Sequence, residues 1–226
     1  MSEIPSTPHT TRLADHVADA FKEGGALARS LNIFEQRHSQ TEMSTAVADI
    51  LDDGGILVVE AGTGIGKTLA YLVPIILSRK RVLISTGTKN LQEQIYFKDL
   101  PALQEALGVT FTATYMKGRA NYLCLHRFEA QYQNPTPRSA TDDAYLTTIK
   151  QWLTVTETGD RAELENIPED LPSWNEISAT NENCIGRECT QYEECFVTRM
   201  RQRASESDLV IVNHHLLCAD AAVRQS

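Results

Sequence analysis

The run VVEAGTGIGKT, residues 58–68, has the residue types and spacing to hold a nucleotide. Its glycines let the backbone curl and approach phosphates closely, and a helix starting after them would direct free N–H groups at the anion. Lys67 is placed to reach the β and γ phosphates, and the Thr68 hydroxyl to bind Mg²⁺. The run predicts a phosphate loop made of Ala61, Gly62, Thr63, Gly64, Ile65, Gly66, Lys67 and Thr68.

This phosphate loop departs from the strict pattern at one position. Ala61 stands where the strict pattern has glycine, so the loop is a variant. A glycine-rich turn that happens to precede Lys-Thr is the alternative interpretation, and the strand and helix expected on either side favour nucleotide binding.

Four of the five cysteines form a second set of residues with chemical potential. Cys124, Cys184, Cys189 and Cys195 are separated by 59, 4 and 5 residues. Without a secretion signal, clustered thiols favour metal binding or reactivity over disulfides. The short intervals fit zinc poorly and match no ferredoxin pattern, so the spacing indicates a metal without naming it. Four scattered buried cysteines are the alternative, and Cys218, beyond the set, is expected to be a core residue.

The net charge of −9 is distributed unevenly along the chain. Residues 61–120 carry eight Lys or Arg against three acids, whereas residues 133–195 carry thirteen acids against four bases. This asymmetry suggests a module around the phosphate loop with a basic groove and a second, acidic module. Ordinary solvated faces would give the same charges. No apolar run is long enough to span a membrane, so a cytoplasmic protein is expected.

Alternating helix and strand signals predict an α/β fold with a parallel, doubly wound sheet and its ligand at the carboxyl ends of the strands. The 42% hydrophobic content is enough for a substantial core. We expect the helix from Lys67 to end or kink near Pro74, and the helix over 89–100 to stop at Pro101. The other expected elements are helices over 12–31 and 38–52 and strands over 56–60, 81–86, 111–116 and 208–213.

More than ninety residues separate the last two expected strands, which is too long for a simple connection. They carry helical signals, and the stretch DDAYLTTIKQWL, residues 142–153, has an apolar face. We therefore expect a helical insertion domain in preference to a disordered linker.

The order of several motifs resembles a known family. The segments VVEAGTGIGKTLAYLVP, VLISTGTKNLQEQ, MKGRANYLCLHR and DLVIVNHHLL, with the cysteines at 184, 189 and 195, are similar to the iron–sulfur superfamily 2 DNA helicases of the DinG/XPD type. The likeness is greatest to the bacterial YoaA branch and covers roughly residues 30–222. Ala61 agrees with the helicase form of the phosphate loop, which removes the earlier discrepancy.

The resemblance implies roles for individual residues. It places Arg37 and Gln40 of the run RHSQ beside the adenine of ATP, although surface polar residues on a helix are a competing interpretation. It gives Lys67 and Thr68 catalytic roles and makes the four cysteines of the set the ligands of a 4Fe-4S cluster. Contacts to single-stranded DNA are implied for Ser85, Thr86, Gly87, Thr88, Lys117 and Arg119. The residues 85–88 would touch the strand's backbone, and a helix N-cap there is compatible with that role.

The implied architecture is a RecA-like P-loop parallel sheet flanked by helices, with a helical iron–sulfur insertion. We expect an N-terminal helical segment at 1–30, the first part of helicase domain 1 at 31–118, the insertion at 119–204, and a return to domain 1 at 205–226. The family's DEAH motif does not follow Asn213, so the chain is expected to be an N-terminal fragment, inactive alone.

The implied activity is ATP-dependent 5′-to-3′ unwinding of DNA in repair or replication, with ATP, Mg²⁺ and the 4Fe-4S cluster as cofactors. Single-stranded and forked DNA are the implied substrates, and the clamp-loader chi subunit is a partner suggested by resemblance only. Two other classes stay open. One is a P-loop enzyme with a structural zinc site, and the other is a nucleotide-driven switch module without catalysis.

Overall fold

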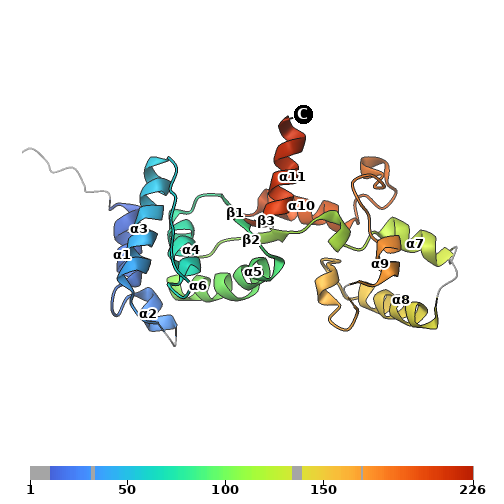
Figure 1. Ribbon diagram of the computed structural model, residues 1–226, viewed down its shortest axis with the longest axis horizontal. Helices are drawn as coiled ribbons and strands as arrows, with labels where there is room; N and C mark the ends of the chain where they lie inside the picture. Colours follow the sequence, from blue (N-terminus) through green and yellow to red (C-terminus); the bar gives the residue numbers. More distant parts are fainter. Residues whose placement is uncertain (1–10, 32–33, 134–138, 169, 226) are drawn as a thin grey trace, which may run out of the picture. The chain divides into compact units, whose positions relative to one another are not determined.

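The computed structural model of the protein describes residues 11–31, 34–133, 139–168 and 170–225 (Figure 1). Its contacts divide the chain into two compact units. Unit 1 comprises Met1–Ala113 and Ser207–Ile211, and unit 2 comprises Thr114–Glu206 and Val212–Ser226. The residues expected to form the insertion, 119–204, fall within unit 2. Residues 1–10 of the expected N-terminal segment lie outside the described residues.

The first helices of unit 1 differ from the single helix expected over 12–31. Helix α1, Leu13–Phe21, and helix α2, Ala26–Ser30, are separated by a turn that contains Gly24 and Gly25. Gly24 has a positive φ of 68°, a conformation that disfavours other residues. A Cβ at Gly25 would lie 2.5 Å from the Asp19 carbonyl oxygen. The turn therefore requires the two glycines, and α3, His38–Asp53, follows close to its expected bounds.

Helical structure continues past Pro74, where a helix was expected to end or kink, and past Pro101, where a helix was expected to stop. Helix α4, Lys67–Ser78, continues through Pro74. Proline removes one backbone hydrogen bond, and the burial of Leu72, Val73 and Ile76 on the same helix offsets that loss. Pro101 lies in the first turn of α6, Leu100–Leu107, where its missing N–H is not needed. Helix α5, Lys89–Gln94, leads into α6 through a π-helical turn, Ile95–Asp99.

A small parallel sheet contains three of the four expected strands. Strands β1, Val82–Thr86, β2, Ala113–Met116, and β3, Leu209–Asn213, lie in the order β1-β3-β2. The prediction of a strand over 56–60 is wrong, because this segment is not part of the sheet. Ile56 and Val58 are 91% and 90% exposed. An apolar run becomes a strand only where a neighbour pairs with its backbone, and no described strand does so.

Unit 2 is mainly helical. Its helices are α7, Leu125–Gln133, α8, Ala140–Leu153, α9, Pro172–Ile177, α10, Phe196–Glu206, and α11, His214–Gln225. Short 3₁₀ turns occur at Arg119–Asn121, Arg161–Glu163 and Gly186–Glu188. Trp174, Ile177 and Ile149 are fully buried in its core, and the partly buried side chains of α8 pack against them. The apolar face predicted for residues 142–153 is therefore confirmed.

Within the part of the chain that the structure describes, no helix is long and apolar enough to cross a membrane.

Candidate functional site

The phosphate loop has the backbone conformation that its glycines allow. Gly64 and Gly66 have φ values of 82° and 86°, and Gly66 is the N-cap of α4. The Lys67 ammonium donates to the carbonyl oxygens of Ala61 at 2.9 Å and Gly62 at 2.7 Å. The lysine side chain thus folds back over its own loop. Its ammonium donates to two carbonyl oxygens there, and the same donors could instead bind phosphate oxygens. Thr68 follows in the first turn of α4 and is half-buried.

Helix α3 holds the phosphate loop through two side chains. The Arg37 guanidinium donates to the Gly64 carbonyl oxygen, and Gln40 Nε2 donates to the Gly66 carbonyl oxygen at 2.9 Å. Gln40 is only 4% exposed, and a Cβ at Gly66 would lie 2.2 Å from its Nε2. Arg37 and Gln40 are therefore brought to the phosphate loop, a contact that the sequence did not predict, and Gln40 is not a surface residue. Their contact with adenine stays a prediction.

The segment Ser85–Thr88 ends β1 and begins α5. Thr88 is the N-cap of α5, and its hydroxyl accepts from the Leu91 N–H at 3.2 Å, so the expected cap is confirmed. Thr86 is buried and donates its hydroxyl to the Thr88 carbonyl oxygen at 3.0 Å. Gly87 and Thr88 are exposed. The turn thus presents backbone and small side chains to solvent, and its contact with a DNA strand stays a prediction.

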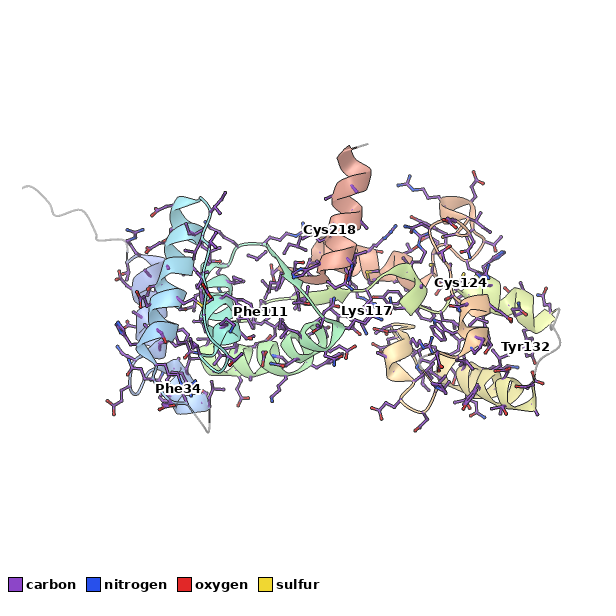
Figure 2. All side chains as sticks on the ribbon, viewed as in Figure 1. Phe34, Phe111, Lys117, Cys124, Tyr132 and Cys218 are labelled. Carbon is purple, nitrogen blue, oxygen red and sulfur yellow. The ribbon has the colours of Figure 1, made fainter. Side chains whose placement is uncertain are left out.

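The four cysteines of the set line one cavity in unit 2, although 59 residues separate the first from the second. Each is half-buried and none forms a disulfide. The cavity has a volume of about 70 Å³, and one water molecule needs roughly 10–15 Å³ of such space. The structure therefore gathers the thiols around a space larger than a single atom. Figure 2 marks Cys124 beside α7.

Burial raises the pKa of the Cys124 thiol, and the neighbouring Cys195, Cys189 and Cys184 raise it further. A hydrogen bond with the backbone of Arg127 acts in the opposite direction. Cys124 thus lies close enough to the other three sulfurs for their charge to affect its pKa. Four thiolates would need a positive centre to coexist there.

No three His, Cys, Asp or Glu side chains among the described residues are close enough to hold a single metal ion. Tetrahedral zinc needs its sulfur ligands about 2.3 Å from one point. A four-iron cluster is held by four thiolates on different iron atoms, so its ligands surround a larger space. The described residues thus place the four thiols around one cavity without forming a ready-made site for a single ion.

Arginines also line the thiol cavity. Arg119 Nε is buried and has no hydrogen-bond partner in the described structure. The Arg127 guanidinium donates to the carbonyl oxygens of Glu176 at 3.0 Å and Asn175 at 3.3 Å, and these two hydrogen bonds hold it in place. An unpaired buried donor is costly unless a ligand accepts from it. Arg119 is thus suited to an anionic group in the cavity, whereas its expected contact with a DNA strand stays a prediction.

Lys117 does not lie on a surface that a DNA strand could reach. Its side chain is 2% exposed, and its ammonium lies 2.8 Å from Asp160 Oδ2, which is 1% exposed. Burial and Asp160 raise the pKa of Tyr115, whose hydroxyl donates to the same Oδ2 at 3.0 Å. The expected DNA contact of Lys117 is therefore without support, because a buried, paired ammonium cannot meet a phosphate.

The structure overturns one expectation and adds residues that the sequence did not single out. Cys218 lies exposed on α11 and not in a core (Figure 2). Gln92 is fully buried, and its Nε2 donates to the Ile211 carbonyl oxygen of β3 at 2.8 Å. Asp160 lies in the acidic stretch 133–195, yet it is buried. A polar residue within an apolar helical pattern, as at Gln92, is a usable sequence signal, but nothing local distinguishes Asp160.

The sequence matches the DEAD/DEAH box helicase family over residues 40–158. It is 42% identical over 212 residues to the ATP-dependent DNA helicase YoaA of Escherichia coli, with 93% of this chain and 33% of that protein covered. Identity to the protein of the same name from Haemophilus influenzae is 41%, with coverage of 94% and 33%. The ATP-dependent helicase DinG of Mycobacterium tuberculosis is 35% identical, with 84% and 32% covered. The chain thus spans about a third of the length of these relatives.

Proposed function

Because the chain belongs to the DEAD/DEAH box helicase family, we propose that it provides the ATP-binding part of an ATP-dependent DNA helicase with a 4Fe-4S cluster. The observation that carries the proposal is that one chain combines a phosphate loop held by a Gln40 hydrogen bond with a cavity lined by four thiols. The relatives named as ATP-dependent helicases support DNA as the substrate and ATP as the energy source.

In this proposal each residue of the loop has a physical task. The N–H groups at the start of α4 hold the phosphates, and Lys67 leaves the carbonyl oxygens of Ala61 and Gly62 to neutralise the β and γ phosphates. The Thr68 hydroxyl holds Mg²⁺. Gln40 and Arg37 keep the loop in register with α3 while they contact the base. The other residues 61–66 contribute backbone to the cradle.

The cluster would be held by Cys124, Cys184, Cys189 and Cys195, with the Arg119 guanidinium offsetting its negative charge. When bound, it supplies a rigid crosslink between chain segments distant in sequence. The turn Ser85–Thr88, which is exposed at Gly87 and Thr88, would contact the backbone of a single strand. Translocation in the 5′-to-3′ direction and unwinding of forked DNA are part of the proposal through the resemblance alone. Binding of a clamp-loader chi subunit and a cytoplasmic location belong to the same proposal and rest on the resemblance alone.

The experiment uses the full-length protein, purified without oxygen, and three variants. Lys67→Ala should lose DNA-stimulated ATP hydrolysis and keep its iron and sulfide, because the lysine lies far in sequence from the thiols. Cys124→Ser should lose the cluster's brown colour. Cys218→Ser, the matched control on exposed α11, should keep it. Colourless wild-type protein with stoichiometric zinc would favour the P-loop enzyme with a zinc site, and undiminished hydrolysis by Lys67→Ala would refute the nucleotide assignment.

A further inference from the structure

Cys124 poses a positioning problem that its own sequence neighbours cannot solve. The other three cysteines of the set lie within twelve residues of one another, whereas Cys124 lies 60 positions before Cys184. Contacts from other parts of unit 2 must therefore set where Cys124 stands. The segment Tyr122–Cys124 shows which contacts these are.

Two chain segments hold the residues up to Cys124 by backbone hydrogen bonds. Leu123 N–H donates to the Gly159 carbonyl oxygen at 2.9 Å, and Cys124 N–H donates to the Ile177 carbonyl oxygen at 2.8 Å. Tyr122 forms an isolated antiparallel bridge with Asp160, and Leu123 forms one with Ser178. The path of the chain into Cys124 is thus fixed on both sides, and residues 159–160 form one of those sides.

Asp160 in turn is held by the buried ammonium of Lys117. The 2.8 Å ion pair is joined by the Tyr115 hydroxyl, and Asp160 Oδ1 accepts from the Ala162 N–H at 3.0 Å. The Lys117 N–H donates to the Tyr122 hydroxyl at 3.1 Å, which closes the network back onto the segment before Cys124. Every charged or polar group in the network has a partner, as a buried pair requires.

Gly159 contacts the segment that carries another cysteine of the set. A Cβ at Gly159 would lie 2.2 Å from the ring of Phe196, the residue that follows Cys195, and its φ of 65° already favours glycine. The residues 159–160 therefore lie between the chain before Cys124 and the chain after Cys195. We call Lys117, Gly159 and Asp160 the clamp.

We infer that the clamp is a positioning device that brings Cys124 and Cys195 to the spacing a cluster requires, and that Lys117 serves this role in place of contacting DNA. The inference rests on the proposed function, because it takes the four cysteines as cluster ligands. Lys117 and Asp160 do not line the thiol cavity, and they act through Tyr122, Gly159 and Phe196.

The first test compares Lys117→Met with the double variant Lys117→Met/Asp160→Leu in the anaerobic full-length protein. The single variant leaves the Asp160 carboxylate buried without its counter-charge, whereas the double variant removes both buried charges. Loss of groups that orient metal ligands costs about 10- to 100-fold in metal retention, so we expect the visible absorbance of Lys117→Met to bleach in air faster by about that factor. The double variant should recover most of the loss.

The second test uses glycines with matched backbone strain. Gly159→Ala adds a methyl group against Phe196, whereas Gly108→Ala, at a φ of 63°, adds one with no atom within 4 Å. Gly159→Ala should lose iron and sulfide, and Gly108→Ala should retain both. This pair keeps the inference testable even where Lys117→Met does not fold.

The outcomes separate the two ideas. Wild-type protein without iron refutes the cluster, and with it the inference. Wild-type protein with a full cluster, together with wild-type bleaching rates for Lys117→Met and Gly159→Ala, overturns the inference alone. A shallower salt dependence of single-strand binding by Lys117→Met, with its cluster retained, would also overturn it, because Lys117 would then be a phosphate contact.

Discussion

Replacing Gly66 by alanine tests whether the hydrogen bond from Gln40 of α3 to the phosphate loop supports nucleotide binding. A left-handed backbone costs a non-glycine residue about 1–2 kcal/mol, and Gly66 has a φ of 86°. The added Cβ would lie 2.2 Å from Gln40 Nε2, and Gln40 is buried, so it has no room to move away. Loss of its hydrogen bond to the Gly66 carbonyl oxygen adds about 1 kcal/mol. The loop conformation should be destabilised by about 2–3 kcal/mol.

Gly64 offers a matched control in the same loop. Its φ is 82°, and a Cβ there would meet nothing within 4 Å. Gly64→Ala should therefore cost only the backbone strain of about 1–2 kcal/mol. The double variant Gln40→Ala/Gly66→Ala has no clash. Adding Gly66→Ala to Gln40→Ala should therefore destabilise the loop less than adding Gly66→Ala to the wild type does.

Titration with a fluorescent ATP analogue measures the effect, because a loop that is less often in its competent conformation binds with proportionally lower apparent affinity. We expect losses of roughly 5- to 30-fold for Gly64→Ala and roughly 30- to 150-fold for Gly66→Ala. Equal losses for the two variants, or a Gly66→Ala loss that is unchanged when Gln40 is already alanine, would refute the reasoning.

Two further predictions follow from charges. The Asp208 carboxylate accepts from the Thr112 N–H and hydroxyl, and these hydrogen bonds hold its pKa below the usual value. Its contribution to stability is present above the unfolded pKa of about 3.9 and is lost as the pH falls through the lower folded pKa. Asp208→Asn should therefore lower the unfolding midpoint at pH 7, and a gap to wild type that fails to narrow below pH 4 would contradict this. Single-strand binding should weaken with salt, by about 0.7 in log affinity per log unit for each phosphate neutralised, and binding indifferent to salt would contradict backbone contacts.

Features that depend on a few neighbouring residues could be predicted from the sequence. Helix α3, strands β1 and β3 and the N-cap at Thr88 arise from apolar periodicity and capping, which act over one or two turns. The phosphate loop belongs to the same group, because its function depends on glycines and a lysine within eight positions. The contacts of Arg37 and Gln40 with the loop were not predicted, because they join residues 27 and 26 positions apart in sequence.

Elements that depend on distant neighbours could not be predicted. Pro74 was expected to end or kink a helix, but α4 continues through it, because burial on the rest of α4 outweighs one lost hydrogen bond. The apolar run 56–60 was expected to form a strand, yet strand formation requires pairing, and the described strands do not pair with it.

The thiol cavity shows most clearly which features the sequence determines and which depend on the tertiary structure. The sequence by itself determined which residues could bind a metal, because only the type and order of the cysteines were needed for that. It did not determine that Lys117, which was expected to contact DNA, and Asp160, in the acidic stretch 133–195, form a buried pair beside the chain leading into Cys124. Charge runs predict solvation on average, whereas burial and pairing are decided residue by residue when packing brings positions 43 apart in sequence into contact. Only the tertiary structure made that decision.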